Sequence, residues 1–268
     1  MPHAEPSADG QPSDPRPAVH PWRRFVALGD SFTEGVGDPD PALPGGLRGW
    51  ADRVAEVLGA GVDDFAYANL AVRGRLLARI VDEQVAPAVA LQPDLVTVSA
   101  GGNDVIRPGS DPDALAARLD PALGTLAATG ATLVLFTGVD VGFSPVFRRI
   151  RGRVATYNEN LRVLAAKHGA LVADQWGLKA IQDPHFWCVD RLHLNEYGHH
   201  EVARMVLGTL GVPNDLEPRR PAPHRTPTWR EARIEDLAWT REYFVPWVLR
   251  RIRRVSSGDR VLPKRPGF

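Results

Sequence analysis

A serine lies directly after an apolar run and among Gly and Asp residues, in the stretch FVALGDSFTEGVGD at residues 25 to 38. Ser31 has two interpretations here. A serine between a strand and a helix is an ordinary N-cap, since its hydroxyl can accept a hydrogen bond from the first turn. The same hydroxyl becomes a nucleophile when an adjacent base takes its proton and a third group orients that base. The remaining polar clusters of the chain therefore decide its role.

The segment DRLHLNEYGHH contains the candidate base and its orienting group. Asp190 and His193 are three residues apart, and on a turn this spacing lets the carboxylate reach one ring nitrogen while the other faces away. Asp-x-x-His alone is a weak signal, because surface pairs of this kind are common. His199 and His200 are rival bases, but they begin a helical segment and we expect them to pack or to face solvent.

Two further clusters contain hydrogen-bond donors for the oxyanion that forms during acyl transfer. Gly74 in NLAVRGRLL ends the second apolar run, where its N–H is not shielded by a side chain. Asn103 in VSAGGNDVIRP follows the third run. Each cluster alone is read more simply as a turn. Asp30 and Asp104 flank the candidates, and either accept backbone N–H bonds that stiffen the loops or are solvated loop residues.

The elements that must position these residues alternate between strand-length apolar runs and segments of helical period. The strand candidates are RFVALG (24–29), DDFAYANL (63–70), DLVTVSAG (94–101), ATLVLFTG (131–138) and ALVAD (170–174). The helical candidates are residues 49–58, 75–89, 111–129, 147–168 and 195–210. The alternation predicts an α/β fold, a three-layer α/β/α sandwich with a flavodoxin-like parallel sheet of about five strands. Ligands bind beyond the carboxyl ends of such strands, where all four polar clusters would meet.

The four clusters occur in the order GDSF, NLAVRG, GGND and DRLH. Together they resemble the four blocks of the SGNH hydrolases, the GDSL-type esterases and lipases, over residues 24 to 210. The resemblance implies Ser31 as nucleophile, His193 as general base and then acid, and Asp190 as its orienting group. It also implies an oxyanion hole made of the Ser31 N–H, the Gly74 N–H and the Asn103 side chain.

The first block departs from the family pattern, because Phe32 replaces leucine. Phe32 is a plausible apolar substitute beneath the nucleophile. Thr33 stands where G-x-S-x-G would have its second glycine, which argues against the nucleophile elbow of the α/β-hydrolase fold.

Composition excludes several other classes of protein. Lys plus Arg equal Asp plus Glu at 32 each, which argues against a nucleic-acid-binding protein. Cys188 is the single cysteine; it rules out an intramolecular disulfide, fits a reducing compartment, and is expected to pack rather than to act as a second nucleophile. No secretory signal, membrane span, phosphate loop or metal-ligand spacing is visible. We therefore expect a cytoplasmic enzyme without a cofactor or metal.

Three parts are predicted along the chain: a disordered leader at 1–22, a hydrolase domain at 23–212, and a Pro-rich linker with a basic helical extension at 213–268. The stretch VPWVLRRIRRV (245–255) can lie on an anionic membrane. Docking onto the body with its arginines toward water is the favoured interpretation, so membrane contact is not expected.

The expected partner is a small-molecule ester, cleaved through an acyl-enzyme. Deacetylation of a carbohydrate and thioester hydrolysis are alternatives at the same site, and a catalytically silent binding module is a third. Aromatic side chains that can line an acyl or sugar subsite, or pack in the core, are Trp50, Phe143, Phe186 and Trp187.

Overall fold

The computed structural model describes residues 20–222, 228–246 and 257–268. Five parallel strands form one sheet in the order β2-β1-β3-β4-β5, which confirms the flavodoxin-like arrangement. The strands are β1 (Arg24–Leu28), β2 (Ala66–Asn69), β3 (Leu95–Val98), β4 (Thr132–Phe136) and β5 (Leu171–Ala173). All four ladders are parallel, so every strand ends at the same edge of the sheet.

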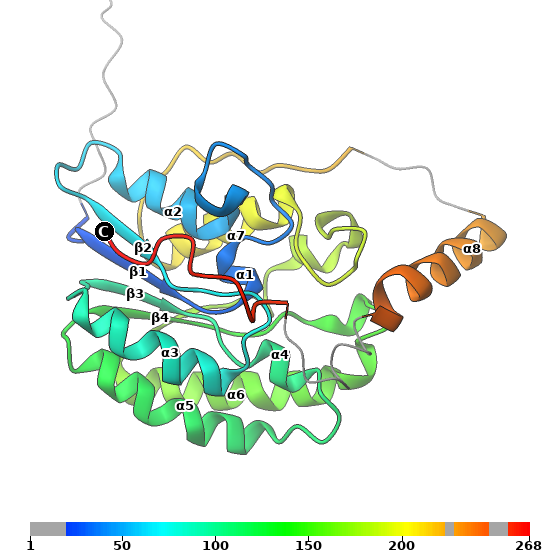
Figure 1. The fold of residues 1–268 in the computed structure, drawn as a ribbon, viewed down its shortest axis with the longest axis horizontal. Helices are drawn as coiled ribbons and strands as arrows, with labels where there is room; N and C mark the ends of the chain where they lie inside the picture. Colours follow the sequence, from blue (N-terminus) through cyan, green and yellow to red (C-terminus); the bar gives the residue numbers. More distant parts are fainter. Residues whose placement is uncertain (1–19, 223–227, 247–256) are drawn as a thin grey trace, which may run out of the picture.

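Helices cover both faces of the sheet (Figure 1), as parallel strands joined by crossovers require. The α-helices are α1 (Ser31–Glu34), α2 (Gly49–Gly59), α3 (Leu77–Ala90), α4 (Gly102–Val105), α5 (Pro112–Ala127), α6 (Arg151–His168), α7 (Glu196–Thr209) and α8 (Trp229–Trp239). Short 3-10 turns are η1 (Pro44–Gly46), η2 (Val141–Phe143), η3 (Arg148–Ile150), η4 (Lys179–Gln182) and η5 (Pro184–Phe186), and α8 continues into a π-helical turn, η6 (Thr240–Phe244).

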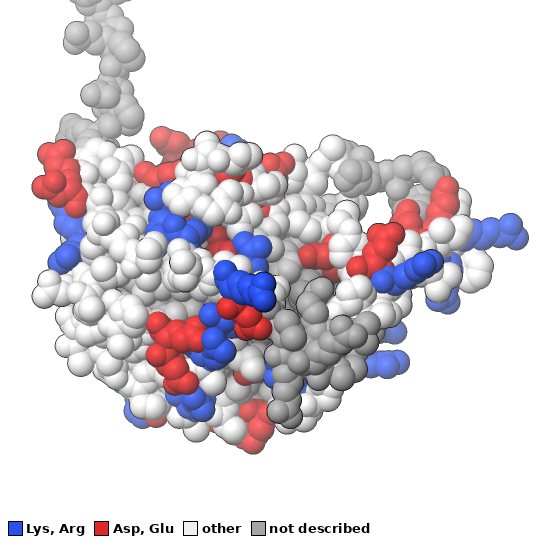
Figure 2. Space-filling view, in the orientation of Figure 1, with Lys and Arg blue, Asp and Glu red and all other residues white. Residues whose placement is uncertain are grey.

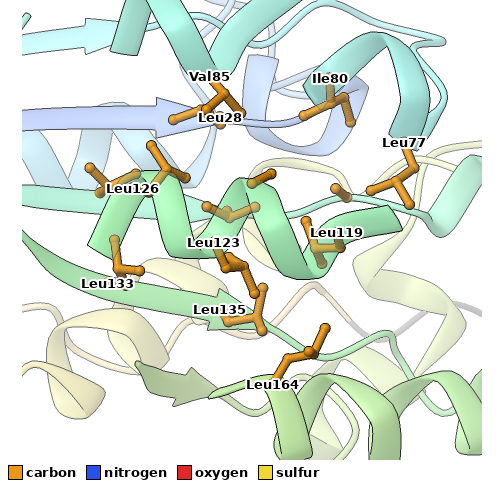
Figure 3. Close-up of a cluster of buried hydrophobic side chains, with 14 of the residues drawn as sticks. Leu28, Leu77, Ile80, Val85, Leu119, Leu123, Leu126, Leu133, Leu135 and Leu164 are labelled. Atoms are coloured by element: carbon orange, nitrogen blue, oxygen red, sulfur yellow. The ribbon is translucent and has the colours of Figure 1, made fainter. Parts of the chain in front are cut away.

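Two apolar cores lie on opposite faces of the sheet. In one core, α3, α5 and α6 pack against strand residues that face these helices, such as Leu28 and Leu135, which are almost completely buried (Figure 3). The other packs α2 and α7 around Phe25 and Trp50. Because both faces are covered, the strands are buried nearly throughout, and this explains why they appear in the sequence as continuous apolar runs.

The segments outside the sandwich are partly described. Of the predicted leader, residues 1–19 lie outside the described residues, while His20 and Trp22 are buried against the body. Most of the basic stretch at 245–255 also lies outside them. Helix α8 projects from the body, whereas the C-terminal segment runs back beside β2 (Figure 1).

The surface carries both signs of charge. On the face in Figure 2, acidic and basic side chains are interspersed, without a large region of one sign. Within the described ranges, no helix combines the length and the apolarity needed to cross a membrane.

Candidate active site

Ser31 is the first residue of α1, directly beyond the end of β1. The cap of this helix is Asp30, whose side chain accepts a hydrogen bond from the Phe32 N–H at 3.1 Å. Capping is therefore done by the preceding residue. The Ser31 hydroxyl lies instead 3.1 Å from Nε2 of His193, a contact that joins residues 162 positions apart.

Asp190 holds the other side of the imidazole. Its Oδ2 lies 2.6 Å from His193 Nδ1, and its Oδ1 accepts the backbone N–H groups of Leu192 and His193 at 2.9 and 3.0 Å. Burial acts to raise the pKa of Asp190, but the hydrogen bonds and charge of His193 outweigh it and lower the pKa below its usual value. The carboxylate therefore stays ionised and favours the tautomer with the proton on Nδ1, which turns the Nε2 lone pair toward Ser31.

A tight loop fixes the relative position of Asp190 and His193. The Cys188 N–H donates to the His193 carbonyl at 2.8 Å, and Trp187 pairs with Leu194 in an antiparallel bridge. Arg191 turns the chain with a φ of 55°, which non-glycine residues seldom adopt. The loop thus brings the two side chains to one side, as their spacing predicts.

Asn103 and Asp30 meet between two strand ends. Asn103 lies in α4, just beyond β3, and its amide donates to Asp30 Oδ2 at 2.8 Å and to the Arg75 carbonyl at 3.2 Å. Burial raises the pKa of Asp30 to about 6, although the N–H of Phe32, the charge of His193 and the amide of Asn103 act against it. Asp30 thus connects the first and third polar clusters.

Gly74 and Asp104 lie in the neighbouring loops. Gly74 has a φ of 73°, a conformation that glycine adopts without strain, in the loop between β2 and α3. Asp104 Oδ2 accepts the N–H of Leu77 at 2.8 Å, so it ties α4 to the first turn of α3. Of the two alternatives left open for Asp104, this contact corresponds to stiffening of the loop.

The rival nucleophile and bases are occupied elsewhere. His199 and His200 are buried, and each ring contacts a backbone carbonyl, that of Val36 and of Glu217 respectively. Burial lowers the pKa of His199 to about 4. Burial, with the charges of two nearby carboxylates, raises the pKa of Cys188 to about 11, which keeps the thiol protonated.

A pocket of about 200 Å³ opens beside Ser31 and His193. Its wall is predominantly apolar and comes from α4, from the segment after β4 and from the start of α6. Its apolar wall residues include Ile106, Val139, Val141, Phe143, Ile150 and Val154. Of the four aromatic candidates, Phe143 and Trp187 line this pocket, whereas Trp50 and Phe186 are buried in the protein.

The pattern that decides the family is spread over residues 27–201, which match the model of the GDSL-like lipase/acylhydrolase family. The chain belongs to this family. Membership makes it a serine-dependent carboxylic ester hydrolase. A sequence search of curated proteins finds no match.

Solved structures share the fold of this GDSL-like chain. The enzyme LAE5 from the metagenome of Lake Arreo is 24% identical with a TM-score of 0.59, covering 70% of this chain and 94% of its own. The esterase EstA from Pseudoalteromonas sp. is 16% identical with a TM-score of 0.56, covering 70% and 97%. Axe2, an acetylxylan esterase from Geobacillus stearothermophilus, is 20% identical with a TM-score of 0.55, covering 70% and 94%.

Two buried side chains hold the backbone near the site of this GDSL-like protein. No pattern in the sequence indicated either of them. The Gln84 amide in α3 donates to the Gly29 carbonyl and accepts the Gly29 N–H, both at 2.8 Å. Tyr157 in α6 donates its hydroxyl to the Ala100 carbonyl at 3.1 Å. Asn195, which caps α7 two residues after His193, was visible as a polar residue before a helix.

Within the described ranges, no group of three or more His, Cys, Asp or Glu side chains is arranged to hold a metal ion.

Proposed function

We propose that the protein hydrolyses small carboxylic esters through an acyl-enzyme on Ser31, with His193 as general base and then acid and Asp190 as its orienting group. The observation that carries this is the continuous contact from Asp190 through the imidazole to the Ser31 hydroxyl, at 2.6 and 3.1 Å. A silent binding module would have no need of this chain of contacts.

The two half-reactions follow from these contacts. In acylation, His193 Nε2 takes the Ser31 proton as Oγ attacks the ester carbonyl, and then gives that proton to the leaving alcohol. In deacylation, the same nitrogen takes a proton from the water that attacks the acyl-enzyme, and then returns that proton to Ser31 Oγ as the acid is released. Asp190 stabilises the imidazolium in both steps. The N–H groups of Ser31 and Gly74 and the Asn103 amide are the proposed oxyanion donors, and the Asn103 amide exchanges its contact with Asp30 or with the Arg75 carbonyl for the oxyanion.

The apolar pocket favours an ester with a hydrocarbon acyl chain. A cavity of about 150 Å³ accommodates a six-carbon benzene ring. On the same scale, the pocket of about 200 Å³ beside Ser31 corresponds to about eight carbons. The wall offers little hydrogen bonding to a carbohydrate, so we assign the pocket to an acyl chain of medium length and expect an acetyl group to leave it mostly empty.

A series of p-nitrophenyl esters from acetate to laurate tests this function. We expect kcat/KM to rise about threefold to fourfold per methylene, the gain from burying a CH₂, up to about eight carbons. Ile150→Trp, which narrows the pocket, should shift the optimum to shorter chains and leave acetate hydrolysis within about twofold. The matched control is Ile234→Trp on exposed α8, which should not change the profile.

Three results would change the assignment. An optimum at acetate would favour the carbohydrate deacetylase. Faster cleavage of an octanoyl thioester than of the matching oxygen ester would favour the thioesterase. If kcat/KM in a series of alkyl acetates peaks at a particular length of the alcohol chain, the pocket would be assigned to the alcohol group of the ester.

A further inference from the structure

The C-terminal segment, residues 257–268, lies outside the family match and packs against the loop that holds Gly74. We call this segment the strap. We propose that the strap is a positioning element of the oxyanion hole, in which Gly258 holds the Arg73–Gly74 peptide so that its N–H faces Ser31. This inference rests on the proposed function, because it assigns a role to the Gly74 N–H.

The strap is anchored at the edge of the sheet. Arg265 and Asn69, the last residue of β2, exchange both backbone hydrogen bonds, at 2.8 and 3.4 Å. The Lys264 side chain is 2% exposed and donates to the carbonyls of Leu47 and Arg48 as well as to Asp52. A lysine buried this completely needs such partners, so the strap has a defined seat on the body.

The other end of the strap touches the loop itself. A methyl group placed on Gly258 would overlap the Arg73 carbonyl oxygen and would lie 2.9 Å from Val72 Cγ1, so the backbone there is in close contact with the loop. Asp259 also lies 3.8 Å from the Arg75 guanidinium. The strap therefore contacts residues on both sides of Gly74.

The contact acts on the peptide group that contains the proposed donor. The Arg73 carbonyl and the Gly74 N–H belong to one planar trans peptide, in which they point in opposite directions. In the present orientation the carbonyl contacts Gly258, so the N–H on the opposite side of the peptide points away from the strap, and loss of this contact would let the peptide rotate. From the other side, Glu34 accepts the Arg73 N–H at 2.6 Å and pairs with its guanidinium. This N–H belongs to the preceding peptide, so Glu34 holds Arg73 from the side of α1 while the strap contacts the Arg73 carbonyl.

Gly258→Ala in the full chain tests the proposal, with Gly267→Ala as the matched control. Neither glycine has a left-handed φ, and the space around the Gly267 Cβ position is open. For Gly258→Ala we expect kcat for p-nitrophenyl octanoate to fall at least tenfold, since losing one oxyanion donor costs about 10²–10³. KM should stay within about twofold, and Gly267→Ala should match the wild type.

A second measurement separates positioning from stability. An alkyl trifluoromethyl ketone adds to the serine and places its oxygen in the oxyanion hole, so its Ki should rise in Gly258→Ala by the same factor as kcat/KM falls. Lys264→Met, which removes the anchor without touching the loop, should lower kcat in the same way at a temperature where it is folded.

Two outcomes would overturn the proposal. The strap only stabilises the fold if Gly258→Ala lowers Tm but leaves kcat and the ketone Ki unchanged. It acts on substrate binding if KM rises alone. Failure of the proposed function has a different signature: wild-type hydrolysis that is absent, or that Ser31→Ala does not reduce.

Discussion

Asp30 connects the nucleophile loop to the third polar cluster through a single carboxylate. One oxygen caps α1 and the other accepts the Asn103 amide. The residue is only 8% exposed, so ionisation of its carboxyl group is opposed by desolvation and supported by these two donors. The balance leaves a pKa of about 6 beside the proposed base.

The raised pKa of Asp30 makes stability depend on pH in a defined direction. Between the ordinary value of 3.8 and the folded value of about 6, the folded protein keeps a proton that the unfolded chain releases. The contribution of Asp30 to the free energy of unfolding is therefore fully present below pH 3.8. It is lost as the pH rises to about 6, and the loss amounts to up to about 3 kcal/mol.

Asp30→Asn removes this titration, so the variant should gain stability relative to the wild type as pH rises from about 4 to about 7. Urea unfolding at several pH values measures the difference. Asp63→Asn, at an exposed carboxylate, is the control and should show no such trend. A constant difference between wild type and Asp30→Asn would contradict the assignment.

Sequence and structure agree best for residues that are close in the chain. Asp190 and His193 could be paired from their spacing, because a single turn brings them together. The link between Asp30 and Asn103 could not, because 73 residues separate them and their contact depends on how two strand ends meet. The cap of α1 is Asp30, so the capping role that the sequence left open for Ser31 is filled by its neighbour.

At the scale of elements, α3 holds the end of β1 through the Gln84 amide. Gln84 is 3% exposed and pairs with both backbone groups of Gly29, two residues before Ser31. The Gly29 carbonyl also accepts the Val72 N–H, at the longer distance of 3.4 Å. The helix thus acts on the backbone that carries the nucleophile.

Gln84→Leu should destabilise the protein by about 1–3 kcal/mol, because it removes the partner of the buried Gly29 N–H and leaves the carbonyl only its longer contact with the Val72 N–H. Chemical denaturation measures the loss. Asp82→Leu on the exposed face of the same helix breaks only the exposed pair with Arg118, and should cost less than about 1 kcal/mol. Equal effects of the two substitutions would show that the amide contributes nothing beyond the helix surface.

The apolar pattern of the sequence predicted the order and type of the strands and helices, but it did not predict the residues at which they begin and end. Each strand is shorter than its predicted run: in DDFAYANL only Ala66–Asn69 pairs, while Asp63 and Asp64 are exposed before the strand and Leu70 is buried after it. Helix α6 starts at Arg151 rather than at 147, because a 3-10 turn, Arg148–Ile150, precedes it. These boundaries depend on contacts with other elements, which no local pattern records.

At the scale of the whole molecule, a buried ion pair joins the C-terminal strap to α2. Asp52 and Lys264 are 212 residues apart and almost completely buried, with Arg265 3.2 Å from the same carboxylate. Burial raises the pKa of Asp52 and lowers that of Lys264, so each depends on its partner to stay charged. The basic excess of the C-terminal region was visible in the sequence, but this use of two of its charges was not, because the complementary carboxylate lies in a distant helix.

Lys264→Met should lower the free energy of unfolding by about 3 kcal/mol, because it leaves Asp52 buried with one partner fewer. Adding Asp52→Asn should recover part of the loss, since the uncompensated charge is then removed. A double-mutant cycle by urea unfolding measures this coupling. Strictly additive losses would indicate that the two side chains do not stabilise each other.

Covalent labelling with a fluorophosphonate tests the central claim, that the His193 imidazole activates the Ser31 hydroxyl. Mass spectrometry of the digested full chain should find one phosphonyl adduct, on Ser31, with loss of fluoride. His193→Ala should slow the labelling and ester hydrolysis by about 10⁴ or more. His168→Ala, which breaks a similar His–Asp contact with Asp120 at 2.6 Å outside the pocket, should change neither. An adduct on another residue, or an active enzyme that Ser31→Ala does not impair, would contradict the account.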